Sequence, residues 1–238
     1  WIAGLELSEE ERSAAASAVD RSLRGYDSLR KVPLTNDVLP AMHFSPLSWR
    51  DTAVEARGQV QPREIAAAQK PDADDQIAFL PVTELAALLR NRQISSVELT
   101  QLYLDRLHRF NKLLNCVVTF TDDWALEQAA AADREIAAGR YRGPLHGVPW
   151  GAKDLIAYPP FKTTWGAPQF KDQVLKQKAT VAQRLDEAGA VLLAKLSLGA
   201  LAWGDEWFGG KTRNPWNPEQ GSSGSSAGSA SATAAGLA

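Results

Sequence analysis

The sequence predicts an α/β fold in which helices cover a sheet of short strands. Between residues 77 and 238, segments with the helical spacing of apolar residues alternate with short apolar runs. Capping boxes mark the starts of two helices, and glycines follow the ends of others. Such alternation is typical of a sheet flanked by helices.

Residues 1–76 are predicted to form an extension on this domain, helical at first and then irregular. Ser8 and Glu11 form a capping box before an alanine-rich helix that should reach about Arg24. Five prolines between residues 33 and 71 then interrupt any long periodicity and leave at most a short helix near residues 64–69. We expect this extension to wrap on the main domain.

Two helices are expected after Pro81. Thr83 can cap the first, whose apolar face carries Leu85, Leu88 and Leu89. Ser95 and Glu98 form a second capping box before the next helix. The apolar face of that helix consists of Leu99, Leu102, Tyr103, Leu107 and Phe110.

The remaining elements alternate in type. Strands are expected at 116–120, 147–156 and 191–194, and helices from Thr121 to near Gly139 and over 180–188, before Gly189. From Gly221 onward the chain consists of Gly, Ser, Ala and Thr without a bulky residue until Leu237, and we expect a helix from about Ser226 to the end.

Composition excludes several classes of protein. With 45% hydrophobic and 23% charged residues, the chain should form a soluble globular domain rather than a disordered one. A net charge of −2 gives no overall basic field, so we expect no nucleic-acid partner. No apolar run approaches the roughly 18 residues of a membrane span, so we expect no membrane insertion. The chain begins at Trp1, which leaves a cytoplasmic and an exported location both open.

Cofactor and metal sites are not expected either. A single cysteine, Cys116, excludes an intramolecular disulfide, and His43, His108 and His146 are scattered without the spacing of metal ligands.

Three motifs carry the functional signal. They are Gly147-Val-Pro-Trp-Gly-Ala-Lys-Asp154, Thr163-Thr-Trp-Gly166, and Asn214-Pro-Trp-Asn-Pro218 leading into a Gly/Ser run. In this order and spacing, and together with residues 184–195, they resemble the amidase signature family over about residues 82–238. The resemblance implies a mixed sheet covered by helices, truncated here so that residues 77–238 form the first half of the domain.

The resemblance implies that Lys153 is a general base. A lysine works as a base near neutral pH only when burial disfavours its charged form, and apolar residues flank Lys153 in the sequence. Taken alone, a lysine in this setting would more often be an ion-paired side chain with a buried stem. The serine run downstream favours the base.

The family's second triad member is a serine that follows a cis peptide bond in a Gly/Ser-rich motif. The run 221–230 offers two registers, which would select Ser222 or Ser225. The match of Gly228-Ser229-Ala230 and of residues 234–237 to the family's continuation selects Ser225. Without this context the run would be interpreted as a flexible linker.

The implied activity is hydrolysis of a carboxylic amide through an acyl-enzyme, with a Ser-Ser-Lys triad and a small-molecule amide as substrate. In the family, the nucleophile lies in an Asp-x-Gly-Gly-Ser-like turn about two dozen residues beyond the bridging serine, which is past Ala238. No such turn occurs in this chain. We therefore expect the 238 residues alone to be inactive, and another chain or segment to supply the second half of the domain.

Other functions remain open. The same region resembles the A-type subunit of a glutamyl-tRNA amidotransferase, and a noncatalytic scaffold that retained the fold is a third interpretation. A phosphate-binding loop at 204–212 is disfavoured because Pro215 and Pro218 prevent the following helix. A hydrolase built on Cys116 and His146 is disfavoured because the cysteine lies in a strand-like apolar context.

Overall fold

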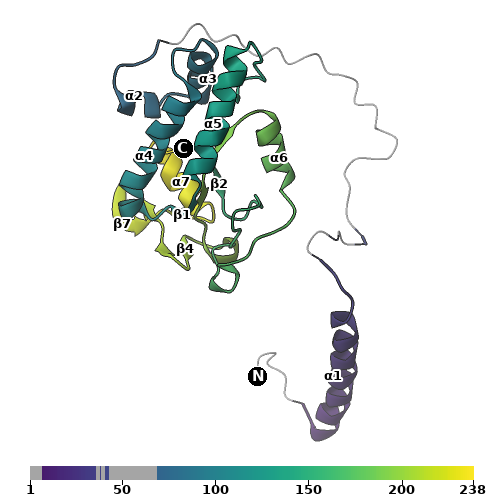
Figure 1. The fold of residues 1–238 in the computed structure, drawn as a ribbon. Coiled ribbons are helices and arrows are strands. Elements are labelled where there is room, and N and C mark those ends of the chain that lie inside the picture. The colour runs from purple at the N-terminus through teal and green to yellow at the C-terminus, as the bar shows by residue number, and fades with distance from the viewer. Residues whose placement is uncertain (1–6, 36–37, 39–40, 43–68) are drawn as a thin grey trace, which may run out of the picture. The chain divides into compact units, whose positions relative to one another are not determined.

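The fold was analysed in a computed structural model that describes residues 7–35, 38, 41–42 and 69–238 (Figure 1). The chain divides into two units, residues 1–61 and 62–238. In the described part of the first unit, helix α1 spans Glu9–Arg30. Its capping box is present as predicted: the Glu11 amide donates to Ser8 Oγ at 3.2 Å, and the Ser8 amide donates to Glu11 Oε2 at 2.8 Å.

The helix α1 is longer than predicted, and none of its residues is buried. It continues past Arg24 through Gly25 to Arg30, whose guanidinium pairs with Asp27 at 2.9 Å. The positive charge of Arg30 in the last turn and its i,i+3 ion pair with Asp27 favour these additional turns. The short helix expected near residues 64–69 falls almost entirely on residues outside the described ranges.

A mixed three-stranded sheet forms the centre of the second unit, as predicted. Its strands are β1 (Val117–Phe120), β2 (Pro149–Lys153) and β3 (Val191–Leu196), in the order β1-β3-β2. The strand β3 pairs antiparallel with β1 and parallel with β2. All six residues of β3 are buried, which explains why residues 191–194 form an apolar run rather than an alternating pattern.

Helices cover the two faces of this sheet. The helices of the second unit are α2 (Asp74–Ala78), α3 (Val82–Arg90), α4 (Ser96–Leu114), α5 (Asp122–Ala137), α6 (Thr180–Glu187) and α7 (Ala227–Ala234). Helices α4 and α5 lie side by side (Figure 1), and α7 packs against β2 and β3. The main core joins Leu99, Leu104 and Leu107 of α4 to Leu193 of β3, while Leu192 belongs to a smaller core with Ala182 of α6.

Helix caps were predicted less well than helices. Helix α3 begins directly after Pro81, so Thr83 lies inside its first turn and does not cap it. Thr121 occupies the N-cap position of α5, but its hydroxyl donates to the backbone oxygen of Leu192 at 2.8 Å and makes no capping bond. The capping box of Ser95 and Glu98 before α4 is confirmed, because both of its hydrogen bonds are present. These bonds join residues three apart, so they depend only on local sequence.

Two further expectations were wrong at element ends. The strand expected at 147–156 forms only over Pro149–Lys153, because the chain turns at Asp154. The final helix ends at Ala234 rather than continuing to residue 238, and Gly236, with φ of +63°, takes the left-handed conformation that commonly follows a helix end.

Two small hairpins were not predicted. They pair β4 (Glu206–Trp207) with β5 (Gly210–Lys211), and β6 (Arg213–Asn214) with β7 (Asn217–Gly221). Most of these strands contain two residues, too few to show any periodicity. The segment that resembled a phosphate-binding loop forms the first hairpin, and no helix follows it before α7.

No helix within residues 7–35 or 69–238 combines the length and apolar character that a membrane span requires.

Truncation of Leu193 to alanine should lower the free energy of unfolding of the full-length protein by about 2–5 kcal/mol, because the site is completely buried in the main core. Denaturant unfolding measures the loss. Val181, half exposed on α6, provides the control, and its replacement by alanine should change stability by no more than about 0.5 kcal/mol. Equal effects of the two substitutions would contradict the assigned core.

Candidate active site

The structure brings together the two residues that the sequence singled out. Lys153 is the last residue of β2, and Ser225 lies in the loop that precedes α7. The Lys153 Nζ atom lies 2.9 Å from Ser225 Oγ and 2.9 Å from Ser226 Oγ. The alternative register is disfavoured, because the Ser222 hydroxyl donates to the backbone oxygen of Ser223 at 3.1 Å rather than contacting Lys153.

The loop around Ser225 is held through its backbone. The peptide bond between Gly224 and Ser225 is cis, as the resemblance predicts. Asp205 Oδ2 accepts the Ser223 amide at 2.9 Å, and the Ser225 carbonyl accepts the Gly199 amide at 3.3 Å. Two loops, one after β3 and one before α7, therefore meet at Ser225.

Close backbone approach explains the glycines in this loop and in the first turn of α7. A Cβ atom added at Gly224 would lie 1.8 Å from the backbone oxygen of Gly204. At Gly228 it would lie 2.4 Å from the backbone oxygen of Cys116 and 2.4 Å from the amide nitrogen of Ser197. Contacts this short leave no space for a side chain, so the glycines serve packing rather than flexibility.

The environment of Lys153 disfavours its charged form relative to an exposed lysine. Burial lowers the pKa of the ammonium group from its ordinary value of 10.5. Within the part of the chain that the structure describes, its polar contacts are the two serine hydroxyls. A neutral amine has two hydrogens and one lone pair, so it can donate to Ser226 and accept from Ser225.

A buried ion pair lies directly behind this lysine. Lys195 Nζ donates to Asp154 Oδ1 at 2.7 Å, and both side chains are fully buried. The second carboxylate oxygen of Asp154 accepts the Thr164 amide at 3.0 Å and also the Thr164 hydroxyl. The Thr163-Thr164 motif therefore binds the residue that follows Lys153.

A protein-family model described as Amidase matches residues 98–238, which is more than half of the chain. The chain belongs to the amidase signature family. The A-type subunit of the glutamyl-tRNA(Gln) amidotransferase of Marinomonas sp. (strain MWYL1) is 42% identical over 160 residues, which make up 66% of this chain and 33% of that protein.

Solved structures agree with this amidase signature fold. The native peptide amidase from Stenotrophomonas maltophilia is 38% identical with a TM-score of 0.61, over 66% of this chain and 34% of that one. A bacterial aryl acylamidase of the amidase signature family is 30% identical with a TM-score of 0.63, over 67% of this chain and 34% of that one. The chain spans about a third of the length of these relatives.

Other candidate residues of this amidase-family chain do not join the site. Cys116 is buried, and burial raises the pKa of its thiol to about 12, which removes it as a nucleophile. His146 is buried beside Glu135 at 3.3 Å, and burial lowers the pKa of its imidazole. His108 pairs with Asp122 at 2.5 Å, and His43 lies outside the described residues. Across residues 7–35 and 69–238, no group of three potential metal ligands occurs.

Lys195 was not singled out from the sequence. The available signal for Lys195 was a charged residue inside an otherwise apolar strand, which requires a buried partner. Trp203 and Phe208, which could have been core residues, are 86% and 39% exposed. Lys178, where the amidase family often has an acidic residue, pairs with Asp186 at 2.5 Å.

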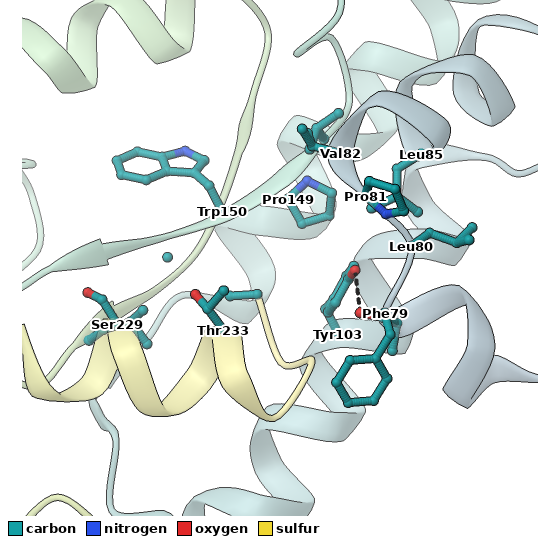
Figure 2. Close-up of a pocket in the computed structure, with 15 residues that line it drawn as sticks. Phe79, Leu80, Pro81, Val82, Leu85, Tyr103, Pro149, Trp150, Ser229 and Thr233 are labelled. Atoms are coloured by element: carbon teal, nitrogen blue, oxygen red, sulfur yellow. Dashed lines mark hydrogen bonds between the residues drawn. The ribbon is translucent and has the colours of Figure 1, made fainter. Parts of the chain in front are cut away.

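Two cavities lie near β2, and the larger one is not where the two site residues meet. It has a volume of about 480 Å³ and lies between the α2–α3 segment, β2 and α7, with Trp150, Ser229 and Thr233 among its walls (Figure 2). Neither Lys153 nor Ser225 lines it. A cavity of about 240 Å³ is lined by the apolar residues Leu155, Trp165, Leu198, Leu201 and Ala202. It adjoins the site through Leu155, two residues after Lys153.

Replacement of Gly224 by alanine should displace the loop that holds Ser225, because the added methyl group would overlap the Gly204 carbonyl. We expect a loss of about 1–3 kcal/mol in the stability of the full-length protein, typical of an overpacked site. Thermal unfolding measures it. Gly25, which has no atom within 4 Å of an added Cβ, is the matched control, and its replacement by alanine should not destabilise the protein. An unchanged melting temperature for Gly224→Ala would contradict the packing.

Proposed function

We propose that this chain carries the base and the bridging serine of a Ser-Ser-Lys amidohydrolase, an enzyme that cleaves a carboxylic amide through an acyl-enzyme. The observation that carries the proposal is the 2.9 Å contact between Lys153 Nζ and Ser225 Oγ, which joins the end of β2 to the loop before α7 in an amidase signature domain. The lysine is the base and the serine passes protons between it and the reacting groups.

The proton transfers balance as follows. Neutral Lys153 takes the hydroxyl proton of Ser225, and Ser225 takes the proton of a nucleophilic serine as that oxygen attacks the amide carbonyl. When the carbon–nitrogen bond breaks, the protonated lysine returns a proton through Ser225 to the leaving amine. Water then attacks the acyl-enzyme by the same route and releases the carboxylic acid. Ser226, which also contacts Nζ at 2.9 Å, can accept an N–H of the neutral lysine and so direct its lone pair toward Ser225.

We also propose that the nucleophilic serine and the backbone amides of the oxyanion hole are supplied by a chain or segment outside these 238 residues. Two facts support this. The chain spans about a third of the length of its relatives, and its sequence contains no Asp-x-Gly-Gly-Ser turn. The substrate is then a small-molecule amide bound where the two parts meet.

A second candidate function is that of an amidotransferase A-type subunit. The 42% identity to the A-type subunit of a glutamyl-tRNA(Gln) amidotransferase favours it, and the likeness to a peptide amidase favours the independent hydrolase. Release of amine from simple amides by the full-length protein on its own would support the hydrolase. Turnover that requires partner proteins and glutamyl-tRNA would support the second function.

In the full-length protein, Lys153→Ala and Ser225→Ala should each lower kcat/KM for amide hydrolysis by at least about 10²-fold, because each removes a step of the proton transfer. Steady-state kinetics measure the loss, and circular dichroism should show an unchanged fold. Lys176, an exposed lysine, is the control, and its replacement by alanine should leave kcat/KM unchanged. Near wild-type activity in Lys153→Ala would refute the proposed base.

The pH profile should show the titration of Lys153. Below its pKa the lysine is protonated and cannot accept a proton, so kcat/KM should rise with pH through that pKa. Because burial lowers this pKa, the midpoint of the acid limb should lie below 10.5. A pH series of initial rates measures it, and a profile that falls with rising pH over this range would contradict a neutral lysine base.

A serine-directed fluorophosphonate probe tests where the nucleophile lies. We expect it to label the full-length protein at a serine outside residues 1–238, since only the nucleophile is activated by the triad. Peptide mass spectrometry identifies the labelled residue. Labelling of a serine within residues 1–238 would contradict this part of the proposal, and labelling outside them that is lost in Lys153→Ala would support both parts.

A further inference from the structure

The Lys195–Asp154 ion pair lies on the face of the sheet opposite Lys153. Along β2, alternate residues point to opposite faces, so Lys153 differs in direction from Ala152. Asp154, in the turn after β2, lies on the side of Lys195 because the two side chains are in contact. Ala152, which pairs in register with Lys195, belongs to the smaller core beside α6. Lys153 pairs in register with Leu196, a residue of the main core, and reaches the start of α7. The ion pair and the proposed base thus lie at the same end of β2, on opposite faces of the sheet.

Every hydrogen-bonding group of the ion pair is used. The three hydrogens of the Lys195 ammonium reach Asp154 Oδ1 at 2.7 Å, the Lys162 carbonyl at 2.8 Å and Thr163 Oγ1 at 3.2 Å. Thr164 occupies the other oxygen of Asp154 through its amide and hydroxyl. With both side chains fully buried, no position is left for a substrate atom.

Stability alone does not account for such a pair. Two buried charges lose most of their attraction to the cost of dehydration, and apolar residues of similar volume are often as stable. Asp154 follows the proposed base in the chain and is bound by the buried Lys195. A role of this ion pair in setting the position and charge state of Lys153 would explain why it is kept.

We propose that Lys195 is a positioning residue for Lys153: its pair with Asp154 fixes the end of β2 and cancels the negative charge that Asp154 would otherwise hold behind the base. This inference rests on the proposed function of Lys153.

The backbone supports the positioning part of the proposal. The Asp154 amide donates to the Leu196 carbonyl at 2.8 Å, and the Asp154 carbonyl accepts the Trp165 amide at 3.2 Å. Asp154 is thus fixed through its backbone and its side chain together. Because Lys153 is the adjacent residue, the direction of its side chain is set by the same bonds.

The charge part follows from Coulomb's law. A carboxylate without its cation would favour the ammonium form of Lys153 and reduce the fraction that can accept a proton. At a separation of about 10 Å and an effective dielectric constant near 20, one unit charge shifts a pKa by about one unit. A shift of this size would move the acid limb of the activity profile by about one pH unit.

Few other buried charged groups are seen on the elements packed against β2 on the side of Lys153. Helix α7 carries no ionisable residue, and the buried ionisable residue of α4 is the neutral Tyr103. In the loop before α7, Asp205 binds the Ser223 amide. On the side of Lys195, charged groups pair as Lys162–Asp172, Lys178–Asp186 and, on α6, Arg184–Glu187.

The test compares Lys195→Met with the double variant Asp154→Asn/Lys195→Met in the full-length protein. The two differ by the charge of Asp154 alone. In Lys195→Met, Thr164 still donates two hydrogen bonds to Asp154, whose carboxylate then has no cation beside it, so the pKa of Lys153 should rise by about one unit. In the double variant it should return close to the wild-type value.

Two measurements report this pKa. The first is the acid limb of kcat/KM, and the second is the pH dependence of Lys153 acetylation by acetic anhydride, followed by peptide mass spectrometry. Lys176→Met is the matched control, and it should shift neither. If Lys195→Met does not fold, Lys195→Gln carries the same prediction, because its amide can still donate to Asp154 while the charge is removed.

The proposal would be overturned if Lys153 had the same pKa in the single variant, Lys195→Met or Lys195→Gln, as it has in the double variant. That result differs from a failure of the proposed function, because acetylation reports Lys153 whether or not the protein hydrolyses amides. An active Lys153→Ala variant would refute the base, whereas unshifted acetylation would refute the role of Lys195.

Discussion

Parallel pairing of β2 with β3 places the carboxyl ends of both strands at the same edge of the sheet, and each polar contact of the site depends on it. Lys153 and Asp154 leave β2 beside Lys195 and Leu196 of β3, which lie about forty residues later in the chain. The chain then continues from β3 into the loop that carries Gly199, whose amide binds the Ser225 carbonyl. One pairing therefore fixes Lys153, the ion pair behind it and one wall of the loop that carries Ser225.

The serine loop is defined by backbone atoms more than by side chains. Gly224 and Gly228 touch carbonyl and amide groups of neighbouring segments at distances that exclude a Cβ atom. Asp205 and Gly199 hold the loop through its amide and carbonyl groups. A composition that would suit a flexible linker thus forms an ordered loop, because the Asp205 carboxylate and the Gly199 amide satisfy polar groups of its backbone.

Local signals were predictable from the sequence, and contacts between distant segments were not. The capping boxes of Ser8 and Ser95 involve residues three apart, so their pattern is visible in the sequence. Thr121 has a capping residue's position, but its hydroxyl binds β3, a partner 71 residues away. The same reasoning applies to the candidate site: Lys153 and Ser225 were singled out through their motifs and do contact each other, whereas the pairing of Lys195 with Asp154 depends on strand register, which motifs do not contain.

The lack of space for a side chain at Gly224 and Gly228 limits how this site can be redesigned. Glycines that approach neighbouring backbone atoms this closely cannot be exchanged for larger residues, so the volume of the site has to be altered elsewhere. The segment Leu201–Trp203 is exposed, and two of its residues adjoin the cavity that includes Leu155. Libraries of variants directed at that segment would change the size and polarity of the apolar wall while the hydroxyls facing Lys153 keep their geometry.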